Sequence, residues 1–180
     1  MSKIGIILGS IRKGRSGEAV ANWVYDIAKA RNAAGFECEL LDLKSFNVPL
    51  LESEVVPGAA NKQYDDANVQ AWSDAIDSCD AFVFVTPEYN HSVPGAFKNA
   101  FDSLGSEWAN KPVAFVSYGF AGGIRAVEAW RVAVANFSMK QLRNQVDINM
   151  ITDYTDGAFT PAEFKAGMMD GVLGEVEAAI

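Results

Sequence analysis

The chain lacks the residues that a metal centre, a disulfide framework or a membrane span would need. It has one histidine, His91, and its two cysteines, Cys38 and Cys79, form no C-x-x-C pair. Its longest apolar runs are about five residues, whereas a membrane helix needs roughly 20. The first residues also lack the longer apolar stretch and cleavage site of a signal peptide. We therefore expect a cytoplasmic protein with reduced thiols, no metal and no membrane contact.

Positive charge is also scarce. Lys and Arg number 15 against 23 Asp and Glu, which gives a net charge of −8 over 180 residues. This balance argues against a nucleic-acid partner or an anionic membrane surface. Three of the basic residues, Arg12, Lys13 and Arg15, nevertheless fall within four positions. Such a local cluster on an acidic chain indicates a small anionic ligand, and a solvated basic loop is the alternative.

The length of the chain suits a single domain over residues 1–180, and its apolar periodicity predicts an α/β fold. Continuous apolar runs are typical of buried parallel strands, and partly alternating ones of more exposed strands. We expect strands at residues 4–8, 37–43, 81–85, 113–116 and 146–150. Apolar residues at i, i+3, i+4 spacing predict helices around 20–28, 69–76, 97–104 and 124–134.

A fifth helix is expected at the end of the chain. Thr160-Pro161-Ala162-Glu163 matches a capping box with proline at the first helical position. The apolar face of this helix is expected to consist of Phe164, Met168, Met169, Val172 and Val176.

Strands that alternate with helices imply right-handed crossovers and a doubly wound parallel sheet of order 2-1-3-4-5. Ligands bind where this order reverses, outside the carboxyl ends of the strands. The loops that meet there are residues 9–16, 86–95 and 117–123. A long stretch of little periodicity, residues 44–61, would border either the ligand or a partner subunit.

The first loop, residues 9–16, has the composition of a phosphate site. Its glycines and the following helix N-terminus direct backbone N–H groups at one point. The hydroxyls of Ser10 and Ser16 can donate to an anion, and Arg12 can form forked hydrogen bonds to phosphate oxygens. Read as a nucleotide-triphosphatase P-loop, the string has Arg15 where lysine is required. A phosphate monoester site is therefore the better interpretation.

The other two loops suit a flat heteroaromatic ring. Pro87, Glu88, Tyr89 and Asn90 offer a stiff backbone and an aromatic face, and His91 beside them is expected to be a loop hydrogen-bonder. Three glycines among residues 119–123 allow close approach of the backbone to a ligand. Arg125 follows at the start of the next helix, where it would meet either an anion or solvent.

The three loops together resemble the NADPH-dependent FMN reductase family, which has a flavodoxin-like, three-layer fold. The resemblance rests on G-S-I-R at 9–12, T-P-E-Y-N-H-S-V-P-G-A-F-K-N-A at 86–100 and S-Y-G-F-A-G-G-I-R-A at 117–126. It implies that the FMN phosphate lies on Ser10, Arg12 and the following turn. It also implies that the isoalloxazine ring is bordered by two groups: Pro87, Glu88, Tyr89 and Asn90 on one side, and Ser117, Tyr118, Gly119 and Gly122 on the other.

The first loop departs from the family pattern R-x-x-S-x-N. Arg15 stands where the pattern has serine, and Gly17 stands where it has asparagine. The nearest serine in this chain, Ser16, comes one place after the pattern's serine. Arg15, Ser16 or both are therefore expected to supply that phosphate contact.

The resemblance implies an FMN-dependent oxidoreductase with NADPH or NADH as donor and ping-pong transfer to a quinone, flavin, azo or metal-oxyanion acceptor. It also implies a homodimer or homotetramer. Two other functions stay open: a flavodoxin-like one-electron carrier, for which the −8 charge would suit basic partners, and a non-catalytic flavin- or partner-binding protein.

Overall fold

The computed structural model describes residues 1–31 and 33–180. Its centre is a five-stranded sheet of β1 (Ser2–Leu8), β2 (Phe36–Asp42), β3 (Ala81–Pro87), β4 (Pro112–Gly119) and β5 (Lys140–Asn149). The order is β2-β1-β3-β4-β5 and all neighbours are parallel, so the predicted doubly wound topology is confirmed. The strands extend up to six residues beyond the predicted cores because flanking polar residues continue the ladder.

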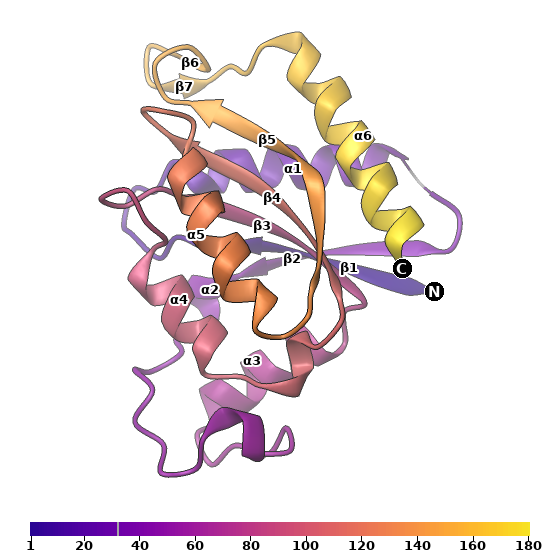
Figure 1. The fold of residues 1–180 in the computed structure, drawn as a ribbon. Coiled ribbons are helices and arrows are strands. Elements are labelled where there is room, and N and C mark those ends of the chain that lie inside the picture. The colour runs from indigo at the N-terminus through magenta and orange to yellow at the C-terminus, as the bar shows by residue number, and fades with distance from the viewer. Residues whose placement is uncertain (32) are drawn as a thin grey trace.

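Helices cover both faces of this sheet (Figure 1). One face carries α1 (Gly17–Arg31) and α6 (Glu163–Ala179), and the other carries α3 (Ala67–Asp77), α4 (Gly95–Asp102) and α5 (Ile124–Ala135). Side chains alternate along β1, so that Ile6 packs under α1 while Ile7 packs under α3 and α4. The α1 side is largely aliphatic, whereas the α3 side holds most of the buried aromatic rings.

The predicted start of the last helix is wrong. Thr160 and Pro161 precede α6, and Ala162 occupies the N-cap position without a side-chain cap. The backbone N–H of Thr160 instead donates to the carbonyl of Asp153 at 2.8 Å, and the Asp153 carboxylate accepts from the N–H of Ala162. Contacts with Asp153 therefore fix the chain just before α6 in place of the predicted cap, and local sequence patterns do not reveal them.

The predicted apolar face of α6 is only partly right. Met169, Val172 and Val176 are buried as expected, but Phe164 and Met168 are exposed. Lys165 takes a buried place because its ammonium group lies 2.7 Å from the Asp153 carboxylate and 2.7 Å from the Asp147 carbonyl. These contacts tie α6 to β5 and to the segment just before the small hairpin of β6 (Tyr154–Thr155) and β7 (Ala158–Phe159).

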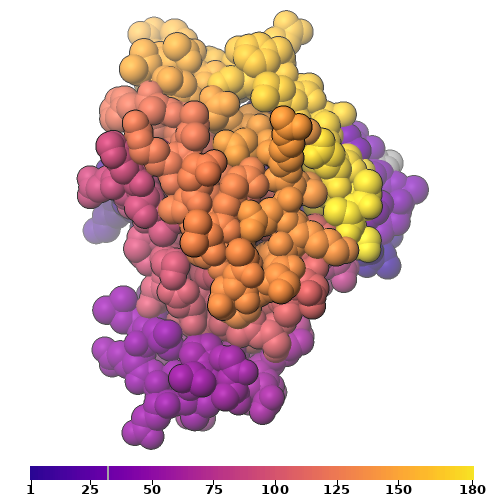
Figure 2. Space-filling view, in the orientation of Figure 1, coloured from indigo at the N-terminus to yellow at the C-terminus, as the bar shows by residue number. Residues whose placement is uncertain are grey.

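The segment between β2 and α3 contains only α2 (Leu43–Phe46) and the short 3-10 helix η1 (Pro57–Ala59). Its purple atoms form a lobe at the lower end of the molecule in the space-filling view (Figure 2). A hollow of about 600 Å³ lies against this lobe, and four of its lining residues are acidic: Glu52, Glu54, Asp65 and Asp66.

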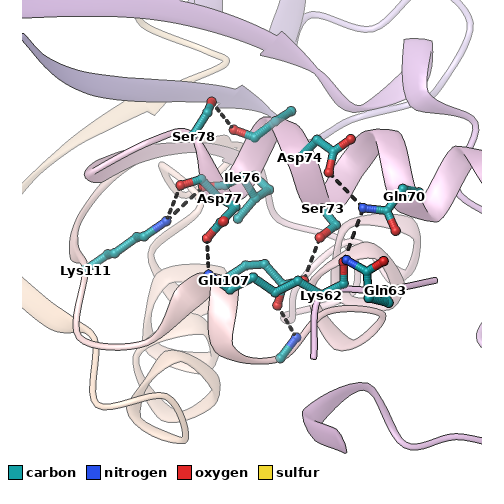
Figure 3. Close-up of polar contacts among 12 residues, drawn as sticks. Lys62, Gln63, Gln70, Ser73, Asp74, Ile76, Asp77, Ser78, Glu107 and Lys111 are labelled. Carbon is teal, nitrogen blue, oxygen red and sulfur yellow. Dashed lines mark hydrogen bonds and ion pairs between the residues drawn. The ribbon is translucent and has the colours of Figure 1, made fainter. Parts of the chain in front are cut away.

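A cluster of polar side chains lies beneath α3, around Glu107 in the short helix η2 (Ser106–Trp108) (Figure 3). Its carboxylate is fully buried and accepts from Tyr64 at 2.8 Å, Ser73 at 2.7 Å and the N–H of Gly105 at 2.9 Å. Nearby, the Lys111 ammonium donates to the last carbonyls of α3 at 3.0 and 3.2 Å. This cluster fastens η2 to α3.

Within residues 1–31 and 33–180, none of the helices combines the length and the apolar character needed to cross a membrane. The same residues contain no group of three or more His, Cys, Asp or Glu side chains placed to hold a metal ion.

Candidate ligand-binding site

The three predicted loops converge at the carboxyl ends of the strands, around a cavity of about 550 Å³. This volume lies within the roughly 300–1,000 Å³ typical of small-molecule sites. The cavity is lined by every predicted site residue except Ser117 and Gly122, namely by Ser10, Arg12, Arg15, Ser16, Pro87, Glu88, Tyr89, Asn90, Tyr118 and Gly119. Residues 44–61, which were a candidate border, do not line it.

Ser117 and Gly122 lie behind the cavity wall and hold it in shape. The buried Ser117 hydroxyl donates to the carbonyl of Gly122 at 2.7 Å, and the N–H of Gly122 donates to the carbonyl of Gly119 at 3.1 Å. Gly122 has φ of 73°, a left-handed conformation that favours glycine. The glycine-rich loop is therefore a pinned turn with Phe120 and Ala121 at its tip.

Arg15 lines the cavity, but its guanidinium is already engaged. It donates to the carbonyl of Ser10 at 2.6 Å and to both carboxylate oxygens of Asp42, at 2.7 and 2.5 Å. These hydrogen bonds to Asp42 raise the pKa of Arg15 above its already high value. Arg15 therefore shapes the first loop by tying it to the end of β2.

Arg12 differs from Arg15 in its surroundings. It is exposed at the cavity wall and forms no hydrogen bond or ion pair with any residue that the structure describes. A guanidinium without a protein partner keeps all five of its donors for a ligand. Of the two arginines, Arg12 is the one whose fork can take a phosphate.

Buried hydroxyl groups lie beneath the first loop. Ser10 is 2% exposed, and its Oγ lies 3.0 Å from the Tyr89 hydroxyl. Tyr118 is 5% exposed, and its hydroxyl lies near that of Ser10 but makes no hydrogen bond of good geometry with the described residues. Burial raises the pKa of Tyr118, so the phenol keeps its proton and can donate it.

The Tyr118 hydroxyl lies against the start of α1. A Cβ atom on Gly17, the first residue of that helix, would lie 2.2 Å from it. The first N–H groups of any helix have no partner within the helix and carry partial positive charge. The resemblance placed Tyr118 near a ring edge, whereas its hydroxyl lies at this helix end, where an acceptor would satisfy it.

The second loop is a rigid hairpin turn. Tyr89 and Ser92 exchange two backbone hydrogen bonds of 3.0 Å, and Asn90 and His91 between them have φ of 49° and 65°. Positive φ at both central positions is the signature of a type I′ turn. Asparagine tolerates this conformation, but histidine is strained in it. The turn therefore presents His91 at the cavity wall at some cost in stability.

Glu88 and Arg125 join the second loop to α5. The Glu88 carboxylate accepts from the backbone N–H of Arg125 at 3.1 Å and from its guanidinium at 3.0 Å. The side chain of Glu88 is 10% exposed and that of Arg125 51%. Arg125 was expected to meet either an anion or solvent, and the structure shows it bound to the Glu88 carboxylate. Its side chain also lines the cavity.

Sequence reasoning missed Met150 as a site residue. It follows β5 and lines the cavity, and its N–H donates to the carbonyl of Gly119 at 3.0 Å. The signal was available, because the carboxyl end of β5 lies at the same edge of the sheet as that of β4. Phe120 lay inside a predicted loop, but nothing in the sequence gave its side chain a role.

Comparison with known proteins identifies relatives of this chain. The family model described as NADPH-dependent FMN reductase matches residues 2–153. An NAD(P)H-dependent FMN reductase of Nectria sp. is 44% identical over 128 residues, which cover 70% of this chain and 64% of that protein. An NAD(P)H:quinone oxidoreductase of Solanum tuberosum is 30% identical over 183 residues, or 97% of this chain and 84% of the relative.

Some similarities are partial. A quinone reductase of Escherichia coli is 35% identical over 66% of this chain and 62% of its own length, so the chain spans less than two thirds of this relative and of the Nectria protein. Among solved structures, FerB of Paracoccus denitrificans, a flavoenzyme NAD(P)H:(acceptor) oxidoreductase, superposes with a TM-score of 0.73 over 99% of both chains. At 23% identity this structure supports the fold alone.

Proposed function

The chain belongs to the NADPH-dependent FMN reductase family, and from this premise we propose that it is an NAD(P)H oxidoreductase that binds FMN in the cavity at the carboxyl ends of β1, β3 and β4. The observation that carries the proposal is the buried, unpartnered Tyr118 hydroxyl beside the start of α1. A buried donor without an acceptor costs about 1–3 kcal/mol. A phosphate monoester at this helix end would remove that cost.

The donor set fits a ligand with an anionic end and a flat end. Towards the first loop lie the free Arg12 guanidinium, the hydroxyls of Ser10 and Ser16 and the first N–H groups of α1. Towards the other two loops lie Pro87, Tyr89, Asn90 and Gly119, which offer ring faces and backbone polar groups. The anionic end would bind by charge-assisted hydrogen bonds, which also fix the position of the flat end.

When bound, FMN would supply the redox chemistry, taking up hydride from NAD(P)H and passing electrons to a quinone, flavin, azo or metal-oxyanion acceptor in a ping-pong sequence. The residues of this chain would position the cofactor and stabilise the loops around it. Arg12 and α1 would hold the phosphate, and Arg15 and Asp42 keep the first loop in shape. The pinned turns at 89–92 and 119–122 fix the cavity walls, so little reorganisation would accompany the reaction.

The relatives also suggest a small-molecule electron acceptor, because several are called quinone reductases. A homodimer or homotetramer in the cytoplasm completes the proposal. The exposed apolar residues of the lobe, Leu50, Val55 and Val56, are a surface that subunit association would cover.

The test is the affinity of the apoprotein for FMN in two neighbouring variants. Arg12→Ala removes the free guanidinium and is expected to weaken binding by about 1.5–3 kcal/mol, the range for hydrogen bonds to charged groups. Lys13→Ala is the matched control, because Lys13 carries the same charge one residue away but does not line the cavity. Equal dissociation constants for wild type and Arg12→Ala would refute the phosphate assignment.

A further inference from the structure

Phe120 has an unusual environment for a phenylalanine in this chain. Of the eleven phenylalanines, only Phe120 and Phe164 are exposed, at 76% and 65%. Phe164 lies on α6 away from the cavity, whereas Phe120 lines it. Among the described residues no aromatic ring packs against Phe120, although most other phenylalanines have such partners. A large apolar ring thus stands in solvent at the cavity wall.

The turn that carries Phe120 is rigid. Three contacts fix its backbone: the N–H groups of Gly122 and Met150 both donate to the carbonyl of Gly119, at 3.1 and 3.0 Å, and the Ser117 hydroxyl holds Gly122 at 2.7 Å. Phe120 is the second residue of this turn, so its Cα–Cβ direction is set by the fold. A pre-positioned ring loses little conformational entropy when it binds a partner.

A second rigid turn lines the same cavity. The type I′ turn of residues 89–92 carries His91, which is exposed and also lines the cavity. The two pinned turns thus contribute an aromatic face and an imidazole to one cavity. This combination suits a planar ring that carries polar oxygen substituents, because aromatic faces stack on flat π-systems and imidazole can donate or accept a hydrogen bond.

We infer that Phe120 is the specificity-determining residue for the electron acceptor, and that it selects planar quinonoid rings by stacking on them at the cavity wall. The inference rests on the proposed function, because it assumes that an acceptor enters this cavity. It adds a property that the proposed function does not supply, namely a preference among acceptors. Acceptors that cannot stack gain nothing from Phe120.

The experiment compares two acceptors in the FMN-loaded protein. One is a naphthoquinone, which can stack, and the other is ferricyanide, which cannot. Phe120→Ala is expected to raise the KM for the naphthoquinone about five- to tenfold, or about 1–1.4 kcal/mol, with little change in kcat. The KM for ferricyanide stays the same. Phe120→Trp is expected to have a naphthoquinone KM equal to or below that of wild type. Phe164→Ala is expected to change the KM for neither acceptor.

A binding measurement gives a readout that does not depend on turnover. Calorimetric titration of the oxidised protein with 2-naphthol, which is planar and is not an acceptor, is expected to give a dissociation constant five- to tenfold higher in Phe120→Ala. Equal 2-naphthol dissociation constants for wild type and Phe120→Ala would overturn the assignment. So would an equal rise in KM for the naphthoquinone and for ferricyanide. So would a change in sedimentation of Phe120→Ala, because it would make the ring a subunit contact.

The outcomes separate this inference from the proposed function. If wild-type protein binds no FMN, or oxidises no NAD(P)H even with ferricyanide, the proposed function fails. If wild type reduces ferricyanide and Phe120→Ala treats both acceptors as wild type does, only the inference about Phe120 fails.

Discussion

Two buried polar regions of this molecule differ in how their groups are satisfied. Around Glu107, a fully buried carboxylate accepts three hydrogen bonds, one from Ser73 (Figure 3) and the others from Tyr64 and the N–H of Gly105. Beneath the first loop, the equally buried Tyr118 hydroxyl has no partner among the described residues. Both regions join loops to helices, but only the first is complete within the protein.

The difference separates polar groups that stabilise the fold from polar groups that await a ligand. A satisfied buried cluster repays its desolvation internally, so its removal costs stability. An unsatisfied group already costs stability, and binding an acceptor recovers it. Substitutions in the two regions are therefore expected to affect different measurements.

The largest effect is expected from Glu107→Leu. Three donors would lose their acceptor at once, and at about 1–3 kcal/mol for each buried donor the free energy of unfolding should fall by about 4 kcal/mol. FMN affinity of the folded protein should not change. Urea unfolding of this variant beside Glu128→Gln, an exposed acidic position on α5, measures the effect. A loss below about 1 kcal/mol would mean that the cluster contributes little.

Asp153 is a buried carboxylate with protein partners, and its pKa makes the stability of the fold depend on pH. Burial alone would raise its pKa, but the Lys165 ammonium and the N–H groups of Asn149 and Ala162 outweigh burial and leave the pKa lowered. A lowered folded pKa contributes stability that is complete above the unfolded value, about 3.9, and is lost as the pH falls through the folded pKa.

Asp153→Asn should therefore cost about 3 kcal/mol at pH 7, because it leaves the buried Lys165 ammonium with only the Asp147 carboxylate, 3.9 Å away, as counter-charge. The difference in free energy of unfolding between the variant and wild type should become smaller below about pH 4. Thermal or urea unfolding between pH 2 and 7 measures it, with Asp170→Asn, an exposed partner of Arg31, as control. A gap of constant size down to pH 2 would contradict the assignment.

Two matched Tyr→Phe substitutions contrast the regions most cleanly. Tyr64→Phe removes a hydrogen bond to the Glu107 carboxylate and should destabilise the protein by about 2 kcal/mol without altering FMN affinity. Tyr118→Phe removes an unpartnered hydroxyl, so the apoprotein should become more stable by up to about 1 kcal/mol, while FMN binds about fivefold more weakly. Destabilisation of the apoprotein by Tyr118→Phe would show that its hydroxyl is satisfied after all.

The smallest expected effect concerns backbone strain beside the cavity. His91→Gly relieves a left-handed conformation and should stabilise the protein by about 0.5 kcal/mol, since glycine gives back part of the gain as unfolded-state entropy. His91→Ala, which keeps the strain but removes the imidazole, is the control. A His91→Gly variant less stable than His91→Ala would mean that the turn is unstrained.

The fold could be predicted because its signals are local and repeated. Continuous apolar runs such as residues 81–85 are typical of strands buried on both faces, and helical spacing between them implied a parallel sheet. The start of α6 could not be predicted, because the contacts that fix the chain just before it come from Asp153, nine residues before Ala162. The burial of Lys165 was missed for a related reason, since only the folded chain brings it to Asp153.

The site was predictable at the level of loops, not of individual side chains. The switch point of the sheet identified which loops meet, and most candidate residues do line one cavity. The sequence could not distinguish Arg12 from Arg15, because the partner that engages Arg15 is Asp42 on another strand. Nor could it indicate that Ser117 lies behind the wall or that Phe120 stands exposed in front of it.

The central claim is that the unsatisfied polar groups at the start of α1 mark an FMN site of an NAD(P)H-dependent enzyme. The most direct test is the visible absorption spectrum of the purified protein, loaded with FMN, before and after addition of NADPH without oxygen. The account predicts protein-bound flavin bands that bleach in one two-electron step. A protein that neither retains nor takes up FMN would contradict it.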